Sequence, residues 1–508
     1  MYHKPLQVFY MKKLTIYFIA LTSLLAVSCN DFLDPQPVGQ IPESEAFTKL
    51  SDCQASINGI YALWNSEALY SGYLTLIPDI ECDMAYPVVG YMGDWQFMFS
   101  WSYGSNTTEV TNVYQQLYRV NNAVNFLLEN YTSAQIKEDE KETLNNILAA
   151  AFFSRALAMT ELVKYYAPVY DPEKAASQIG VQIQDKANDN SVKPARATLA
   201  ANYQHILDDL QKASALCTLD EADAIYITKG AIDALYARVY LYMQNWNEAA
   251  KAATRVIDNK NYTLADATAL SDETNPLSSE FTAMWWIDQS NEIIWKLKYT
   301  VTDRPGTLGR NFCYVNGTEY KLEYAPAKKV IDMYDNSESA VDLRLYHYCC
   351  PAMVQGQQSN IILKYPGNET LETGTPLYSN MPKVMRLAEM YLIRAEAYAR
   401  MSPSQPSKAN ADLHTLREKR ILGYVKKDVS GAQLLKAIKD ERIKELFMEG
   451  HRFYDLKRYG EGFARKAQYL SLAPDDALEI KPEHFRWLWP IPKHEMDANT
   501  NVEQNPGY

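Results

Sequence analysis

The chain contains 508 residues, of which 47% are hydrophobic and 22% are charged, so it is long enough to fold around a sizeable core. Its formal net charge of −12 argues against nucleic-acid binding and against membrane attachment by a polybasic patch, because both need a basic surface. The length predicts two to four domains, unless the chain is a repeat protein that forms one larger body.

The beginning of the chain has the features of a signal peptide. Two lysines precede an apolar segment from Leu14 to Ser28. This segment is shorter than the about 20 apolar residues that a membrane-spanning helix needs, and no later segment reaches that length without charges. We therefore predict a signal peptide over residues 1–28, with Met11 as its true start, and a mature chain without a transmembrane helix.

Cys29 follows this segment in the sequence LAVSC, which resembles the lipobox where a bacterial signal peptide is cut and the cysteine is acylated. Ala26 stands where that pattern usually has leucine, and an ordinary signal peptide with a chance cysteine is the alternative. Residues 29–45 then form a lipidated cysteine and a Pro-containing tether, and several acyl chains would anchor the chain stably. The six later cysteines show no CxxC framework, so the sequence permits a disulfide but selects no pairing.

From residue 46 onward the chain is typical of a mostly helical body. Three segments repeat a helix–turn–helix theme, at residues 149–170, 234–257 and 384–420. In the clearest one, Ala237, Trp246 and Ala249 lie close to the small and aromatic positions of a tetratricopeptide repeat. Small residues at these positions let two helices approach closely. Long insertions separate the segments, so we do not expect a plain solenoid.

Two regions break the helical pattern. In the first, aromatic residues alternate with smaller or polar ones, at Trp95, Phe97, Phe99, Trp101 and Tyr103. This period of two predicts a β-strand. In the second, residues 291–299 predict a strand, and Gly- and Tyr-rich loops follow it up to residue 324.

Five segments in the same order resemble the motifs of the SusD family, the SusD/RagB-like outer-membrane nutrient-binding lipoproteins of Bacteroidetes. They are CNDFLDPQP, RATLAANYQHILDDLQKA, RLAEMYLIRAEAYA, ERIKELFMEGHRFYDLKRYG and PIPKHEMDANTNVEQNPGY. Each motif alone is modest evidence, but five of them between Cys29 and Tyr508 make the resemblance specific.

The resemblance implies a mostly α fold, with a scaffold of about four tetratricopeptide-like helix pairs and an irregular, loop-rich second part with short strands. Within a single body over residues 46–508, these parts would cover residues 46–270 and 271–508. It also implies a lipoprotein on the outer membrane, facing the cell exterior, that captures oligosaccharides without catalysis. The implied partner is a SusC-like TonB-dependent transporter barrel, which receives the captured glycan.

Sequence motifs for catalysis are absent, and the strongest candidate for it is a carboxylate pair. The chain has no G-x-S-x-G elbow, P-loop or G-x-G-x-x-G motif. A glycosidase needs only two carboxylates, and Glu445 and Glu449 would share one helix face. The nearby Arg442, Arg452 and Arg458 favour structural ion pairs instead, because they would lower a carboxylate pKa below that of a general acid.

The sequence predicts neither a metal site nor a cofactor. No two histidines lie three or four residues apart, so a helical two-histidine metal site is absent. Asp332, Asp335 and Asp342 lack the spacing of an EF-hand loop, and we interpret their segment as a solvated turn rather than a calcium site.

Glycan capture needs aromatic plates for the apolar faces of sugar rings, and Asp, Asn or Arg side chains for the hydroxyl groups. The first candidate cluster contains Asp83, Asp94, Trp95 and Trp101. The second candidate cluster contains Trp285, Trp286, Arg310, Asn311, Tyr314 and Tyr320. For the first cluster the alternative is a strand that buries one aromatic face. The adjacent tryptophans of the second cannot face the same way on regular structure, so we expect at most one of them to be buried.

Three alternatives to a glycan receptor stay open at this point. The chain could be a peptide-binding relative within the same family, a surface-anchored glycoside hydrolase, or a tetratricopeptide scaffold that binds only protein. The sequence does not identify the glycan.

Overall fold

The computed structural model describes most of the chain after residue 45. The described ranges are 46–187, 191–221, 223–317, 319–334, 337, 339–354, 356–372, 374, 376–466 and 479–508. The predicted signal peptide, Cys29 and the rest of the tether lie outside these residues. Lys49–Tyr508 forms one compact unit.

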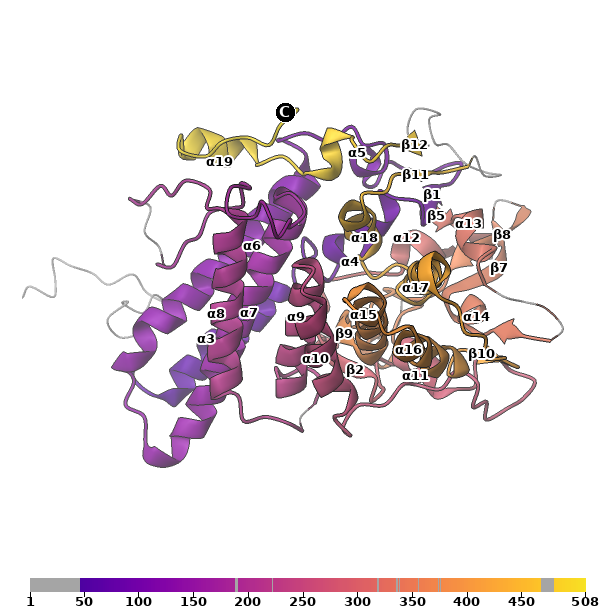
Figure 1. Ribbon diagram of the computed structural model, residues 1–508, viewed down its shortest axis with the longest axis horizontal. Coiled ribbons are helices and arrows are strands. Elements are labelled where there is room, and N and C mark those ends of the chain that lie inside the picture. The colour runs from indigo at the N-terminus through magenta and orange to yellow at the C-terminus, as the bar shows by residue number, and fades with distance from the viewer. Residues whose placement is uncertain are drawn as a thin grey trace, which may run out of the picture. The chain divides into compact units, whose positions relative to one another are not determined.

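The predicted mostly α fold is confirmed, and long helices pack in neighbouring pairs (Figure 1). Within the described ranges the pairs are α3 (Leu50–Trp64) with α6 (Thr108–Asn130), α7 (Lys141–Tyr166) with α8 (Leu199–Leu216), α9 (Lys229–Tyr242) with α10 (Trp246–Ile257), and α15 (Leu387–Arg400) with α16 (Pro406–Glu418). The helix α17 (Gly431–Glu445) packs against the last pair. Each of the three segments predicted to contain helix–turn–helix units contributes to these pairs.

The α9–α10 hairpin shows how the sequence forms such a pair. The turn between the two helices contains Gln244 with a φ of 59°, and the Asn245 side chain accepts a hydrogen bond from the Glu248 N–H at the start of α10. Ala249, Ala252 and Ala253 are buried on α10, where their small side chains allow close approach of α9 and α15.

Helix α7 is the interior helix of the first two pairs. Among the described residues, Glu138–Tyr166 is the one helical stretch long and apolar enough to cross a membrane, but 89% of its most apolar window is buried inside the protein. A helix that is apolar all round is typical of a protein core as well as of a membrane span. Its buried Arg155 donates to both carboxylate oxygens of Asp209 on α8, at 2.7 and 2.8 Å, so the charge inside the core is paired.

The described β-structure consists of short ladders. The two-stranded sheets are β1 (Ala85–Pro87) with β5 (Tyr324–Pro326), β2 (Ile293–Lys296) with β9 (Lys383–Arg386), β6 (Val341–Asp342) with β10 (Ile421–Leu422), and β11 (Phe463–Ala464) with β12 (Glu479–Ile480). Three of these antiparallel ladders, β1–β5, β2–β9 and β6–β10, join segments far apart in sequence. A four-stranded sheet has the order β3 (Val315–Asn316), β4 (Glu319–Tyr320), β7 (Cys349–Val354) and β8 (Gln357–Ile362), with β4 and β7 parallel. The strand predicted within residues 291–299 is confirmed as β2.

The strand predicted from the alternating aromatic residues is wrong. Gln96–Phe99 forms a single helical turn, α5, and both Trp95 and Trp101 have left-handed backbone, with φ of 59° and 54°. The alternation arises because the chain turns on both sides of α5 and so buries Phe99 and Trp101 while it leaves Phe97 exposed.

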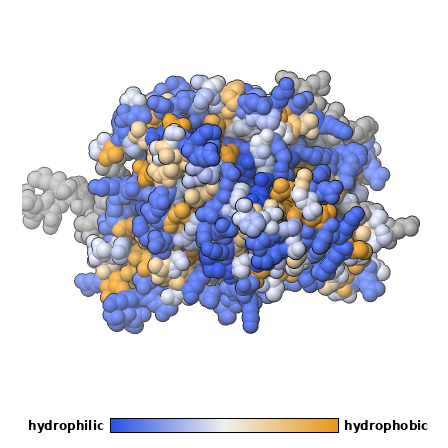
Figure 2. Space-filling model, in the orientation of Figure 1, coloured by the Kyte–Doolittle hydropathy of each residue, from blue (hydrophilic) through white to orange (hydrophobic). Residues whose placement is uncertain are grey.

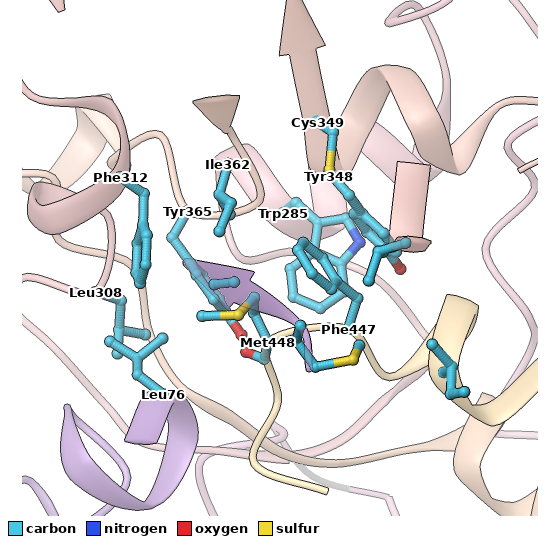
Figure 3. Close-up of a cluster of buried hydrophobic side chains, with 14 of the residues drawn as sticks. Leu76, Trp285, Leu308, Phe312, Tyr348, Cys349, Ile362, Tyr365, Phe447 and Met448 are labelled. Atoms are coloured by element: carbon cyan, nitrogen blue, oxygen red, sulfur yellow. Dashed lines mark hydrogen bonds between the residues drawn. The ribbon is translucent and has the colours of Figure 1, made fainter. Parts of the chain in front are cut away.

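Shorter helices, most of them in the second half of the chain, complete the unit. They are α4 (Tyr73–Ile80), α11 (Glu280–Trp286), α12 (Arg310–Cys313), α13 (Lys328–Ile331), α14 (Arg344–Tyr348), α18 (Arg452–Tyr459) and α19 (Lys493–Ala498). A large hydrophobic cluster collects side chains from several of them, with Trp285 beside Tyr348, Tyr365 and Phe447 (Figure 3). Hydrophilic side chains cover most of the face seen in Figure 2, and apolar ones form only small scattered groups there.

Candidate functional site

The ladder between β1 and β5 brings the two predicted site regions together. Pro87 pairs with Tyr324, so the segment that leaves β1 lies beside the segment that enters β5. The Glu323 carboxylate, just before β5, accepts the Met92 N–H at 2.7 Å, and the Glu323 N–H donates to the Asn311 carbonyl at 2.9 Å. Residues 88–95 and 307–323, more than 200 positions apart in the sequence, therefore form neighbouring walls.

Between these walls and the start of α4 lies a cleft of about 590 Å³. The cleft is lined by Glu67, Ser71, Gly72, Tyr73, Leu76, Met92, Gly93, Asp94, Trp95, Glu109, Thr307, Arg310, Asn311, Tyr314, Lys321 and Glu323. Five of the predicted site residues are among them: Asp94, Trp95, Arg310, Asn311 and Tyr314. Members of both predicted clusters thus share one site.

Trp95 supplies the aromatic surface of the cleft. Its ring stacks on Tyr324 with the centroids 6.1 Å apart and an angle of 20° between the planes, and the Tyr324 hydroxyl donates to the Asp94 carbonyl at 2.5 Å. The left-handed backbone at Trp95 is unusual for a bulky residue, and such conformations concentrate at functional sites. The half-buried indole is held from one side and lines the cleft.

A close backbone approach fixes the distance between two cleft walls. A Cβ atom at Gly306 would lie 2.3 Å from the Ser71 carbonyl oxygen, so only glycine fits there without a shift of one of the two segments. The segment 66–73 and the segment 305–311 are thereby held in contact next to the cleft.

Charged groups in the cleft have no partners of opposite charge within the described part of the chain. This holds for Glu67, Asp94, Glu109, Arg310 and Lys321, none of which forms an ion pair there. Burial, together with the nearby charges of Glu67, Glu109 and Asp94, raises the pKa of Tyr73 to about 12, and all four residues line the cleft.

The same charges act on one another. Burial and the Asp94 charge raise the pKa of Glu109, although its backbone hydrogen bond opposes the shift. Burial raises the pKa of Glu323 in the same way, against its bond to Met92 and with a further contribution from Asp94. Lys321 and Arg310 both flank Tyr314, because the Lys321 N–H donates to the Tyr314 carbonyl and the Arg310 guanidinium lies 5.9 Å from the Tyr314 ring.

Asp83 and Trp101, the other members of the first predicted cluster, lie in the protein interior. The Asp83 carboxylate is bound by Arg452 at 2.7 Å and by Lys329 at 2.5 Å, and it is 2% exposed. The Trp101 indole N–H donates to the Glu81 carbonyl at 2.5 Å, and its ring packs against Trp487. Their contacts are structural, and we leave both out of the site.

The second cluster is divided in the same way. Trp285 is fully buried in the core (Figure 3), whereas Trp286 is half-buried and packs against the same core from outside the cleft. The expectation that at most one of the two would be buried matches this arrangement. Tyr320 lies on β4 and packs on a separate cluster around Cys313 and Leu322, also outside the cleft lining.

Sequence reasoning missed Tyr73, Glu67, Glu109, Lys321 and Glu323. Tyr73 and Glu109 lie in the first turns of α4 and α6, and Glu67 lies in the turn after α3, where polar residues are common and carry no signal of their own. Lys321 and Glu323 directly follow the Tyr-rich loop, so a wider window around Tyr314 would have included them.

Glu445 and Glu449 belong to a buried ionic cluster and not to the cleft. The Glu445 carboxylate accepts from Arg344 at 2.9 Å, from Arg386 at 2.6 Å and from Arg420 at 3.1 Å. Glu449 is bound by Lys364 at 2.5 Å and by Arg386 at 2.7 Å. Burial opposes ionisation, but these cations outweigh it and hold the pKa of both carboxyls low. The structural interpretation of this pair is supported.

The cations bound there are not those predicted. Of the three arginines named from the sequence, Arg442 binds Asp455, Arg452 binds Asp83, and Arg458 binds Glu396. The interpretation of the segment around Asp342 as a solvated turn was also wrong for this residue. Asp342 is fully buried and receives two hydrogen bonds from the Arg344 side chain, at 2.8 and 2.6 Å.

Comparison with known families identifies both halves of the chain. Residues 306–508 match the model described as SusD family, and residues 31–241 match the model described as starch-binding associating with outer membrane. The chain is a SusD/RagB-like protein. The two matched ranges contain the two walls of the cleft, one in each range.

Similar proteins cover nearly the whole chain. SusD-like protein P2 of Formosa agariphila is 25% identical over 98% of this chain and 100% of its own length. The starch-binding protein SusD of Bacteroides thetaiotaomicron is 32% identical over 138 residues, which are 27% of this chain and 22% of that protein. A crystal structure of a putative sugar-binding protein from Bacteroides vulgatus superposes with a TM-score of 0.75 at 26% identity, over 91% of this chain and 99% of that one.

Proposed function

We propose that this SusD-like protein is a cell-surface receptor that binds oligosaccharide or polysaccharide in the cleft around Trp95. The observation that carries the proposal is the aromatic face of Trp95 in a cleft whose remaining lining is mainly polar. Sugar rings stack their apolar faces on such a plate, while carboxylates, Asn311 and Arg310 bind their hydroxyl groups. The starch-binding and sugar-binding descriptions of the relatives support the same class of ligand.

Transport is the second part of the proposal. Captured glycan would pass to a SusC-like TonB-dependent barrel in the outer membrane, and acylated Cys29 with the tether of residues 29–45 would hold the body, residues 46–508, at the cell exterior. The family description that refers to the outer membrane supports this location. Replacement of Cys29 by Ala should release the protein from the membrane fraction, and surface labelling of intact cells would report on its orientation.

We further propose that the protein binds without catalysis. The most suggestive carboxylate pair of the sequence, Glu445 and Glu449, is bound by buried cations and is closed to substrate. The cleft does contain carboxylates with raised pKa values, as general acids have, and a hydrolysis assay tells binding from catalysis there.

The test uses the chain from Asn30 onward, which retains the whole compact unit. Affinity electrophoresis and calorimetry against soluble polysaccharides and their oligomers should show binding to one polymer class. Chromatography of the same mixtures after long incubation should show no released product. Release of shorter oligomers would establish a hydrolase instead, and failure of every glycan alongside binding of peptides would establish a peptide receptor.

A further inference from the structure

The cleft has two chemically different ends, and they differ in charge. Glu67, Asp94 and Glu109 line the cleft together with Tyr73, and their charges contribute to the raised pKa of its hydroxyl group. Of the two cations of the cleft, the Arg310 guanidinium lies 5.9 Å from the Tyr314 ring, and Lys321 is joined to the Tyr314 carbonyl through its backbone N–H. We call the first group the acidic end of the cleft.

No counter-charge within the described residues neutralises the acidic end. Its three carboxylates form no ion pair there, and the fourth cleft carboxylate, that of Glu323, is 8% exposed and is bound only by backbone N–H groups. Many buried carboxylates elsewhere in the described part of this protein are paired with arginine or lysine, as Glu445 is, although Asp79 accepts only backbone N–H groups. An unpaired group of carboxylates in a cleft creates a negative potential, because low-dielectric walls focus the field.

Ser71 adds no free group to this wall. It lines the cleft, but its side chain is 1% exposed and lies beside the buried Tyr299 hydroxyl, which can satisfy it. The acidic end of the cleft therefore offers the carboxylate oxygens as its acceptors, which suit sugar hydroxyl or ammonium groups.

We propose that Glu67, Asp94 and Glu109 determine ligand specificity, so that the cleft accepts neutral or amino sugars and rejects sugars with carboxylate or sulfate groups at this end. The proposal rests on the proposed function, since it concerns the same cleft. A carboxylate or sulfate group of the ligand within a few ångströms of one of these three residues would weaken binding several-fold. Repulsion from two or three of them at once would weaken binding further. Hydroxyl groups, in contrast, donate hydrogen bonds to carboxylates, and ammonium groups add charge attraction.

The two cations do not reverse this expectation. The Arg310 guanidinium lies beside Tyr314, where it would bind hydroxyl oxygens or a single acidic group at the other end of the ligand, and Lys321 adds one further positive charge to the lining. A polymer with an acid on every residue would still place its charges at the acidic end. Four carboxylates against two cations leave the cleft lining negative, and the whole chain carries a net charge of −12.

The test compares polymers that share a backbone but differ in charge. Starch, dextran and laminarin would each be titrated against the Asn30–Tyr508 chain, next to the sulfated derivative of the same polymer, with chitosan oligomers as the amino sugar. For a polymer that binds, we expect its sulfated form to bind about tenfold more weakly, and we expect added salt to narrow the difference.

The triple variant E67Q/D94N/E109Q removes the charges and keeps the shapes of the side chains. It should bring the affinities for the neutral and sulfated polymers to within about threefold of each other. The matched control E273Q/D139N/E483Q changes the net charge by the same amount at exposed positions outside the cleft. It should keep the wild-type difference in affinity between the neutral and the sulfated polymer.

Two results would overturn the proposal. One is a wild-type chain that binds a sulfated or uronate polymer as tightly as its neutral counterpart. The other is a control variant that narrows the difference in affinity between the neutral and the sulfated polymer as much as the cleft variant does. The effect would then come from net charge alone. Failure of the proposed function looks different, since no polymer of any charge would then bind.

Discussion

The buried ionic cluster and the cleft are built from the same residue types but differ in how their charges are satisfied. In the cluster, the Glu445 carboxylate meets three arginines and is fully buried. In the cleft, Glu67 and Asp94 lie at the surface without a cation, and so do Arg310 and Lys321 without an acid. This difference indicates that paired charges stabilise the fold in this protein, whereas unpaired charges remain available to a ligand.

The largest effect that would test this contrast is expected for Glu445→Ala. The substitution leaves three buried arginines without their shared acceptor, and breaking a buried ion pair of this kind costs about 3–5 kcal/mol. Urea unfolding followed by circular dichroism would measure the loss. Glu418→Ala is the control, because Glu418 pairs with Lys426 at the surface and should matter by less than about 1 kcal/mol. Equal losses in the two variants would contradict the structural role of the cluster.

The next effect is pH-dependent and concerns the neighbouring Glu396. Burial opposes its ionisation, but Arg458 and two further arginines outweigh burial and lower its pKa from 4.5 to about 2. Because the folded-state pKa is depressed, this group contributes stability above pH 4.5 and loses the contribution as the pH falls toward 2. Glu396→Gln should therefore cost about 3 kcal/mol at pH 7 and almost nothing at pH 2.

Unfolding curves of wild type and the Glu396 variant between pH 2 and pH 7 would measure this difference. If the difference in the free energy of unfolding between wild type and Glu396→Gln stays constant from pH 2 to pH 7, the carboxylate charge is not what stabilises this contact.

In the cleft, Trp95→Ala is expected to weaken glycan binding by tenfold or more, about 1.4 kcal/mol, since central aromatic residues dominate such sites. Trp286→Ala is the matched control, because Trp286 is a half-buried tryptophan outside the cleft lining. Calorimetry on both variants should show unchanged affinity for the control. Loss of binding in the control alone would move the site away from Trp95.

The smallest effect is expected for Arg310→Ala. The guanidinium is exposed and without an ion pair in the described part of the chain, so its removal should leave the melting temperature within about one degree. Glycan affinity should fall about threefold, as for the loss of one hydrogen bond at the rim of a site. A drop in stability without a change in affinity would show that Arg310 stabilises the fold and does not bind the ligand.

The fold was predictable from the sequence to a large extent, because its signals are local. Alanines at helical spacing and the cap at Asn245 indicate the α9–α10 hairpin without reference to any other segment. The alternating aromatic residues around Trp95, in contrast, led to a wrong prediction. A period of two predicts a strand, but left-handed turns at Trp95 and Trp101 produce the same alternation of buried and exposed rings.

The candidate site was predictable only in part, because exposure depends on distant segments. Trp95 and Trp285 are both tryptophans near polar loops, but the first lines a cleft and the second lies under Tyr348 and Tyr365 in the core. Nothing near Asp83 in sequence indicates that Arg452 binds it from 369 positions away. The meeting of the two predicted regions likewise depends on the β1–β5 ladder, whose three-residue strands have no distinct sequence pattern.

Helix α4 joins the cleft to the buried ionic cluster around Glu445 and Glu449. Its first residue, Tyr73, lies in the cleft, and Asp79 near its other end accepts the N–H groups of Glu449 and Arg452 at 3.1 and 2.9 Å. One wall of the cleft is therefore tied through this single short helix to the buried ionic cluster, so a change at Asp79 should reach Tyr73 and the bound ligand as well as the stability of the fold.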